Sequence, residues 1–278
     1  MPVDTKRLRG PEESQSPLLF ARPEAGSGRG AGAWQPLPRG DGRSAAEPRP
    51  VFARAGLLSQ ADGSVYAECG RSKLLCAVYG PRESERKEER SMSRANLLCE
   101  LRFAPFSCKK RSAWIQGSLE KEYSSILEQS LRPAVCLHKY PRSQIEVYVM
   151  VLENDGSTLG AALTCASMAL AEAGIEMFDV VVGCSLRQAG DVSLLDPTAL
   201  EEYNAADCKG INNGSLTVAL LPTLNQISGL VSSGEWKEQI SVEAIKACIE
   251  GCQKLYSVVQ QCLTRSVKKR IPAPVTKS

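Results

Sequence analysis

The sequence predicts an α+β protein in which mixed β-sheets pack against helices. Three observations lead to this prediction: some segments have apolar residues at helical spacing and others at strand spacing, the two kinds do not alternate strictly, and hairpin signals are frequent. The chain has 278 residues and is 43% hydrophobic. It can therefore bury the core of one large domain or of two small ones.

The chain is expected to begin with a flexible tail over residues 1–38. This segment is rich in Pro, Gly, Arg and Ser and shows no apolar periodicity, so it cannot bury enough surface to offset the entropy of ordering. We expect a single domain over residues 39–265 and a short basic tail over residues 266–278.

The first predicted element of the domain is a β-hairpin over residues 65–79. Its two apolar runs, VYAEC and KLLCAVY, flank Gly70-Arg71-Ser72. Residues 82–94 alternate in charge sign and predict a solvated loop. Residues 97–103 then predict a further strand, with one apolar face formed by Leu97, Cys99, Leu101 and Phe103.

A helix is predicted from Ser118, with that residue as N-cap and Pro133 just beyond its end. Its apolar positions are Leu119, Tyr123, Ile126, Leu127 and Leu131. Residues 144–152 alternate and are rich in β-branched side chains, which predicts a strand. A turn at residues 154–156 closes it.

A second helix is predicted from this turn to Gly174, and its Ala, Gly and Ser content allows close approach to a neighbouring sheet. Strands are predicted over residues 180–185, 216–221 and 226–232. The last predicted element is an amphipathic helix, whose apolar stripe contains Val242, Ile245, Ile249, Cys252, Tyr256, Val259 and Leu263.

Net charge, cysteine content and the lack of long apolar segments limit the kinds of function that the sequence supports. A formal net charge of +3 does not by itself indicate nucleic-acid binding, so only local clusters of Lys and Arg can argue for RNA. The eleven cysteines are odd in number and irregularly spaced, and the N-terminus has no signal-peptide core. These features favour a reducing compartment. No segment approaches the roughly twenty apolar residues of a membrane span.

The metal-binding residue types do not form a recognisable site. His138 is the one histidine, and Cys248 and Cys252 stand four residues apart with no second ligand pair nearby. A helix face packed in the core explains the two cysteines better than zinc does. We therefore expect neither a metal nor another cofactor.

Several motifs together resemble the RNase PH-like family. Residues 39–50, RGDGRSAAEPRP, lead into a strand and hairpin as in the opening of that family, and residues 126–175 follow in the family's order of helix, strand, turn and helix. The resemblance covers about residues 39–265. It is greatest to non-catalytic subunits of the eukaryotic RNA exosome ring, of the mRNA-transport-regulator type, on LLDPTALEEY at 194–203 and LTVALLPTLNQISGL at 216–230.

The resemblance implies an RNase PH-like fold, of the ribosomal protein S5 domain 2-like kind. It also implies a ring of like-folded subunits capped by S1/KH-type proteins, with RNA threaded through a central channel and hydrolytic ribonucleases associated. The expected role is structural support of 3′-to-5′ RNA processing and degradation, including rRNA maturation and mRNA turnover. The expected locations are nucleus, nucleolus and cytoplasm.

Phosphorolysis brings two anions together, so a catalyst needs cations or oriented donors. Active family members carry GGTR before the second helix, where the helix start and the Arg hold phosphate. This chain has Gly156-Ser157-Thr158-Leu159 instead. Residual anion binding at Gly156–Thr158 stays open as an alternative to a capped helix that packs Leu159 into the core.

Active members also place two aspartates in a DLDYxED-like stretch near the scissile bond. Here residues 194–202 read LLDPTALEE, which resembles the non-catalytic subunits. We predict that Asp196 is a helix N-cap, that Pro197 is the first helical residue, and that Glu201 and Glu202 lie in solvent. No catalytic residue is assigned.

The candidate RNA-binding residues are Lys109, Lys110 and Arg111, three adjacent cations that can neutralise backbone phosphates without reading sequence. A solvated loop and a contact with a neighbouring subunit are the alternatives. Trp114 is a candidate either for base stacking or for burial at a subunit interface. The cluster at residues 268–270 is interpreted as a solubility or nuclear-targeting feature, and His138 as structural.

Two other functions remain as hypotheses. One is an active phosphate-dependent exoribonuclease that uses Arg102 or Arg111 as the cation and Asp196 or Asp207 as the acid. The other is a binding module outside RNA metabolism that has kept only the fold.

Overall fold

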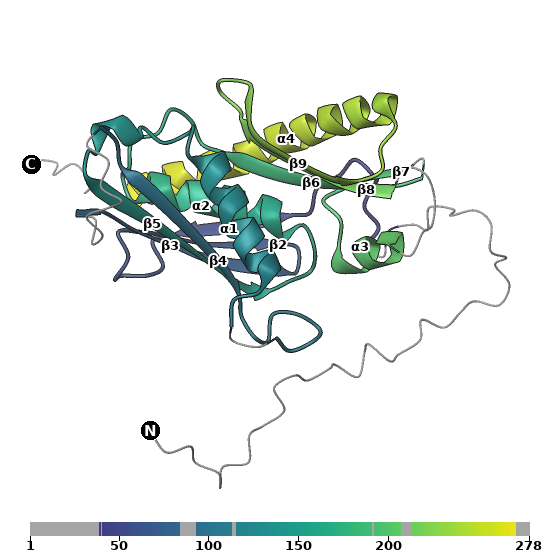
Figure 1. Ribbon diagram of the computed structural model, residues 1–278, viewed down its shortest axis with the longest axis horizontal. Coiled ribbons are helices and arrows are strands. Elements are labelled where there is room, and N and C mark those ends of the chain that lie inside the picture. Colours follow the sequence, from purple (N-terminus) through teal and green to yellow (C-terminus); the bar gives the residue numbers. More distant parts are fainter. Residues whose placement is uncertain are drawn as a thin grey trace, which may run out of the picture.

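Two β-sheets and the helices packed on them make up the described part of the chain (Figure 1). The structure is a computed structural model, and it describes residues 39, 41–83, 93–112, 115–190, 192–206 and 213–270. The expected tail over residues 1–38 and most of the expected loop over 82–94 lie outside these ranges.

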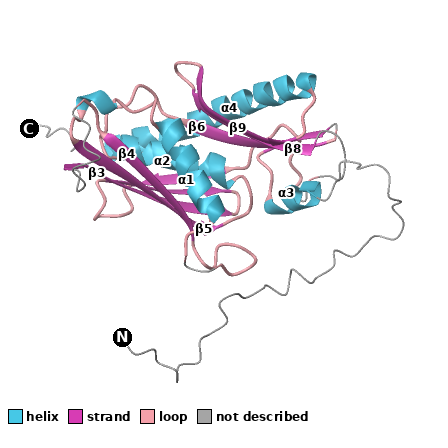
Figure 2. Ribbon diagram, in the orientation of Figure 1, coloured by secondary structure: helices cyan, strands magenta, loops and turns pink. Residues whose placement is uncertain are grey.

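The first sheet has five strands in the order β1-β2-β3-β5-β4. Its strands are β1 (Val51–Ala55), β2 (Gly63–Cys69), β3 (Ser72–Glu83), β4 (Asn96–Phe103) and β5 (Ser143–Glu153). Figure 2 labels β3, β4 and β5 of this sheet, with its strands in magenta. Because β4 runs parallel to β5 while the other pairs are antiparallel, the sheet is mixed, as predicted. The β2–β3 hairpin pairs Cys69 with Ser72, and Gly70 in the turn has φ +61°.

The second sheet has four strands in the order β7-β6-β8-β9, all antiparallel. They are β6 (Val182–Ala189), β7 (Val192–Leu195), β8 (Asn213–Leu221) and β9 (Gln226–Gly234). The strands predicted over 180–185, 216–221 and 226–232 correspond to β6, β8 and β9. Strand β6 begins two residues later than predicted and continues to Ala189.

The helices are α1 (Ser118–Leu131), the short 3-10 helix η3 (Leu137–Lys139), α2 (Thr158–Glu172), α3 (Ala199–Ala206) and α4 (Glu238–Arg270). Helix α2 is buried along almost its whole length and contacts both sheets, through β2, β3 and β6. Its small residues permit this, since Gly160 lies directly against Gly183 of β6. Helix α4 covers β6, β8 and β1.

The structure corrects several helix details. The N-cap of α1 is Gly117 and not Ser118. Helix α4 buries Ala244, Cys248, Gly251, Cys252 and Val259, a stripe rotated from the predicted one, and Val242 is 48% exposed. The helix also runs to Arg270, so residues 266–270 of the expected tail are helical.

The cysteines lie mostly in the core. The ten that the structure describes are all free, and Cys248 and Cys252 are 0% exposed. Among the described residues there is no group of three or more side chains suited to a metal ion. No helix in the described ranges is long and apolar enough to cross a membrane.

Candidate functional site

The turn that starts α2 is the one that the sequence resemblance compares with a phosphate-binding turn. Its residues Gly156 and Ser157 have φ of +82° and +53°. A Cβ on Gly156 would lie 2.6 Å from the Pro197 carbonyl oxygen, so this position requires glycine. The side chain of Asn154 secures the turn, because its Oδ1 accepts bonds from the Gly156 amide (3.1 Å) and the Thr158 hydroxyl (2.6 Å).

A cleft of about 290 Å³ opens beside this turn. Its walls are α1, the start of α2, the beginning of α3 and one face of the second sheet. That sheet face is rich in hydroxyl groups from Ser185, Ser215, Thr217 and Ser233. Leu159, where the resemblance leads us to expect Arg in an active member, lines the cleft and is only 5% exposed. This burial agrees with the alternative in which Leu159 packs into the core.

The charges around the cleft do not suit a phosphate. The residues that line it include one cation, Arg187, and two carboxylates, Glu122 and Glu202. Moreover, Glu202 Oε1 accepts a hydrogen bond of 2.9 Å from the Ser157 amide. The backbone donor that an anion would use at the helix start is therefore already bound to a carboxylate of the same chain.

The guanidinium of Arg187 is held at the far wall of the cleft. Its Nη2 donates to Asn213 Oδ1 at 2.8 Å. Its Nε is buried and has no hydrogen-bond partner within the described residues. One guanidinium that is partly committed to Asn213 offers much weaker anion binding than paired cations would.

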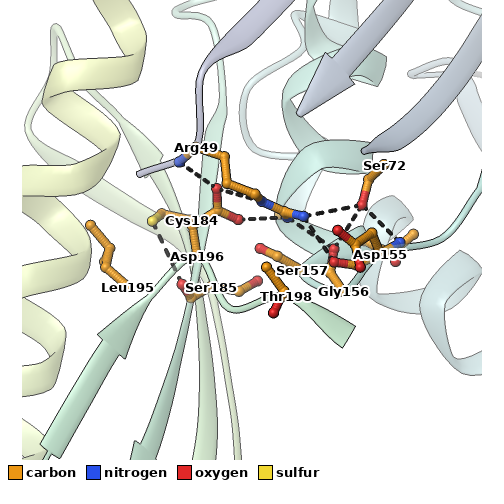
Figure 3. A network of polar contacts seen from close by, with 12 residues as sticks. Arg49, Ser72, Asp155, Gly156, Ser157, Cys184, Ser185, Leu195, Asp196 and Thr198 are labelled. Carbon is orange, nitrogen blue, oxygen red and sulfur yellow. Dashed lines mark hydrogen bonds and ion pairs between the residues drawn. The ribbon is translucent and has the colours of Figure 1, made fainter. Parts of the chain in front are cut away.

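A buried ion pair ties the α2 turn to the end of β7 (Figure 3). Arg49 Nε and Nη2 donate to the two carboxylate oxygens of Asp196 at 3.0 and 2.8 Å, and the Arg49 amide adds a third bond at 2.9 Å. Arg49 also donates to the carbonyl oxygens of Asp155 (2.9 Å) and Gly156 (3.0 Å). Arg49 thus holds the α2 turn and Asp196 in one rigid unit.

The same ion pair determines the protonation of Asp196, which is 8% exposed. Burial alone raises the pKa of Asp196, but the hydrogen bonds and charge of Arg49 outweigh it and hold the pKa below its usual value. For Arg49, burial lowers the pKa and the bonds to Asp196 raise it, with a net increase. Both shifts favour the charged form of each group, as expected for a buried ion pair.

The predicted roles of residues 196–202 are wrong in detail. The N-cap of α3 is Thr198 and not Asp196, because Glu201 Oε2 accepts from the Thr198 amide (2.8 Å) and Thr198 Oγ1 accepts from the Glu201 amide (3.4 Å). The glutamates do not simply lie in solvent either. Glu201 pairs with Arg39 at 3.3 Å, and Glu202 bonds the α2 turn. Both carboxylate oxygens of Asp196 accept hydrogen bonds from Arg49, so this side chain does not cap α3.

The two residues just before the predicted RNA-binding cations Lys109, Lys110 and Arg111 contact Asn154 of the same turn. The Ser107 carbonyl accepts a bond of 2.9 Å from the Asn154 amide, and Cys108 Sγ accepts one of 3.7 Å from the Asn154 side chain. The three cations themselves are exposed. The structure therefore places the segment just before these cations beside the α2 turn, while a role of the cations in RNA binding stays a prediction.

The other candidate residues lie apart from one another. Arg102 is engaged with Glu100 at 2.6 Å, and His138 is exposed and stacks on Phe178 with ring centroids 6.3 Å apart. In the 268–270 cluster, Arg270 binds Glu172 at the opposite end of α2 from the cleft. Trp114 and Asp207 lie outside the described residues.

Comparison with known proteins identifies the class. Residues 47–176 match the 3′ exoribonuclease family, domain 1. The chain is 47% identical to the exosome complex component MTR3 of Homo sapiens over 97% of this chain and 98% of that one. It is 36% identical to the exosome complex component Rrp41 of Pyrobaculum arsenaticum, over 81% of this chain and 89% of that one.

Solved structures agree. Rice Rrp46 aligns with a TM-score of 0.69 and 25% identity over 81% of this chain and all of that one. The Archaeoglobus fulgidus exosome with RNA bound to its active site shares the fold, with a TM-score of 0.64 and 20% identity over 78% of this chain and 91% of that one. The chain therefore belongs to the RNase PH-like 3′ exoribonuclease family. Its strongest likeness reported above is to a component of the MTR3, or mRNA transport regulator, type, as its motifs predict.

Proposed function

We propose that this chain is a non-catalytic structural subunit of the RNA exosome core ring, which supports 3′-to-5′ RNA processing and degradation by organising the ring and its RNA channel. The observation that supports inactivity most directly is the bond from the Ser157 amide to Glu202, because it fills the anion position at the start of α2. The likeness to exosome components supports the place in the ring.

The charge balance of the cleft gives the physical reason for inactivity. A phosphorolytic site must hold inorganic phosphate beside an RNA phosphodiester and stabilise further negative charge in the transition state. Here Leu159 supplies no cation, and Asp196 is bound in an ion pair with Arg49. The carboxylates of Glu122 and Glu202 line the cleft together with one guanidinium, that of Arg187. Each of these features disfavours the second anion.

The proposal includes partners and locations. The partners are other RNase PH-like ring subunits, S1/KH-type cap subunits, RNA in the central channel and associated hydrolytic ribonucleases. The protein works in the nucleus, nucleolus and cytoplasm. It needs no cofactor for a structural role.

The isolated chain should not shorten RNA in a phosphate-dependent manner. The measurement is release of nucleoside diphosphates from a labelled RNA with inorganic phosphate and Mg²⁺, compared with the same mixture without phosphate. We expect no difference above background, and native mass spectrometry of the complex purified from cells should find the chain in a hetero-oligomer with cap subunits. Phosphate-dependent release of nucleoside diphosphates by the homogeneous wild-type chain would overturn the proposal of inactivity.

We also propose that Lys109, Lys110 and Arg111 contact RNA in the channel. Reversing all three charges to Glu should reduce RNA crosslinking to this subunit several-fold, because contacts to phosphates are electrostatic and lose counterion release. Crosslinking should be measured in an assembled ring. The matched control reverses the exposed Lys268 and Lys269 at the end of α4, which should leave crosslinking unchanged. Equal crosslinking by the wild-type and Lys109–Arg111 variant rings would remove the loop from the RNA path.

A further inference from the structure

Three cysteine side chains meet in the core where α4 packs on β6. Cys184 belongs to β6, while Cys248 and Cys252 lie one helical turn apart on α4. Each of the three is at most 2% exposed. The helix backbone comes close to the strand here, because a Cβ on Gly251 would lie 3.0 Å from Cys184 Sγ. Figure 3 shows the Cys184 sulfur on the side of β6 that faces α4.

Cys184 is the shared hydrogen-bond partner of the other two thiols. Its side chain bonds those of both Cys248 and Cys252. The two bonds outweigh burial and the negative charge of Asp196, and they lower the pKa of Cys184 to about 5. The same bonds, together with burial, raise the pKa values of Cys248 and Cys252. Cys184 is therefore the sulfur of this group most readily present as a thiolate, the form that reacts with peroxides.

A small cavity borders Cys184 and gives room for an oxidant. Its volume is about 30 Å³, roughly twice what a single buried water molecule requires. Cys69 and the polar side chains of Ser157, Thr164 and Asp196 also line it. Hydrogen peroxide has two oxygen atoms, and these polar side chains can exchange hydrogen bonds with it. One peroxide molecule can therefore lie beside the Cys184 sulfur.

Cys76 of β3 and Cys165 of α2 form a second buried thiol pair that provides a comparison. Their side chains are hydrogen-bonded, and both residues are 0% exposed. The Cys165 thiol also donates to the Val65 carbonyl at 3.5 Å. Neither cysteine lines the cavity beside Cys184. Contact between two buried thiols is thus present here without that cavity.

We propose that Cys184 and Cys248 are a site of reversible oxidation, at which hydrogen peroxide joins them in a disulfide bond. The Cys184 thiolate attacks one peroxide oxygen and the O–O bond breaks, which leaves a sulfenic acid and hydroxide. The hydroxide takes up the proton that the Cys184 thiol has lost and becomes water. The Cys248 sulfur then attacks the Cys184 sulfur, and the displaced hydroxide leaves with the Cys248 proton as a second water. Two thiols are oxidised, and one peroxide is reduced to two water molecules.

Cys248 is the expected partner because Cys252 is held elsewhere. The Cys252 thiol donates to the Val182 carbonyl at 3.4 Å, a bond that a disulfide would break. The disulfide between Cys184 and Cys248 joins α4 to β6 covalently. Disulfides that form in reducing compartments are usually transient, so thiol reductants return both residues to the free state that the structure shows. None of these steps depends on a place in a ring.

Mass spectrometry of peptides from the unreduced full chain tests the proposal. The chain is treated with hydrogen peroxide and then unfolded in an alkylating reagent, which blocks the remaining thiols. The disulfide between Cys184 and Cys248 should increase about tenfold over the untreated chain and disappear when dithiothreitol follows the peroxide. Cys76 and Cys165 should stay reduced as the internal control. A Cys184 that stays reduced, or disulfide formation by the control pair to the same extent, would overturn the proposal.

Two alanine variants identify the partner. Cys248→Ala should abolish the peroxide-dependent disulfide of Cys184, whereas the matched control Cys252→Ala should retain it. Circular dichroism before treatment verifies the fold of both variants. If a variant fails to fold, the wild-type peptides still test the proposal, because they identify which sulfurs are joined. A disulfide from Cys184 to Cys69 or to Cys252 in the wild-type chain would contradict it.

Discussion

Replacing Asp196 with Ala is expected to lower the free energy of unfolding by about 3–5 kcal/mol, because it breaks a buried ion pair and leaves one charge unpaired. The charge left without a partner is that of Arg49, which is 3% exposed and makes three hydrogen bonds to the Asp196 carboxylate. The change should appear in urea unfolding followed by circular dichroism.

The matched control is the exposed ion pair of Lys73 and Glu153, 2.9 Å apart on the surface of the first sheet. Lys73→Ala should lower the free energy of unfolding far less than Asp196→Ala does, because solvent screens exposed pairs. A similarly small loss for Asp196→Ala would show that the buried pair does not hold the site together.

The ion pair also predicts how stability depends on pH. The pKa of Asp196 is depressed in the folded state, so its stabilisation is complete above the unfolded-state pKa of about 3.9 and is lost as pH falls through the folded value. Wild-type stability should therefore fall below about pH 4, and Asp196→Ala should show a shallower fall.

Replacing Gly183 with Ala is expected to cost about 1–3 kcal/mol or more, because it forces α2 away from β6. The new Cβ would lie 2.5 Å from the Gly160 carbonyl oxygen and 2.9 Å from its Cα. Both atoms belong to the backbone, so no side-chain rotation can relieve the contact. Thermal unfolding should show a clear decrease in Tm.

The control for this contact is Gly160→Ala on the opposite side. Its Cβ would meet Ser185 Oγ at 3.1 Å and β6 backbone atoms at 3.3 Å, which is tight but tolerable. Alanine also favours the helix by roughly 0.5–1 kcal/mol. We expect a much smaller loss than for Gly183→Ala. If Gly183→Ala were neutral, the close packing of α2 on β6 would not be as described.

Local patterns in the sequence predicted most of the fold. The hairpin over residues 65–79 and the helix ending at Gly174 were predicted because turn residues and periodicity act over a few positions. Strands β1 and β7 were missed, and α3 was predicted only as a helical turn. With five, four and eight residues, these elements are too short for periodicity to show clearly.

The candidate site was only partly predictable. The sequence alone shows Leu159 where the resemblance leads us to expect Arg, and the proposed inactivity starts from this difference. The parts played by Arg49, Arg187 and Glu202 were missed, although Arg49 lies in the EPRP stretch that carries part of the family resemblance. Nothing near Glu202 in the sequence indicates that its partner is the Ser157 amide, 45 positions earlier.

The sequence by itself determined the α+β class, the family resemblance and the missing cation at residue 159, since each depends on residue types at short, fixed spacings. Only the tertiary structure determined which charged side chains form ion pairs. Arg49 and Asp196 are 147 residues apart and pair because the first sheet, α2 and β7 converge there. That convergence turned Asp196 from an expected helix cap into a buried counter-ion, because a desolvated guanidinium gains more from a carboxylate than a helix start does.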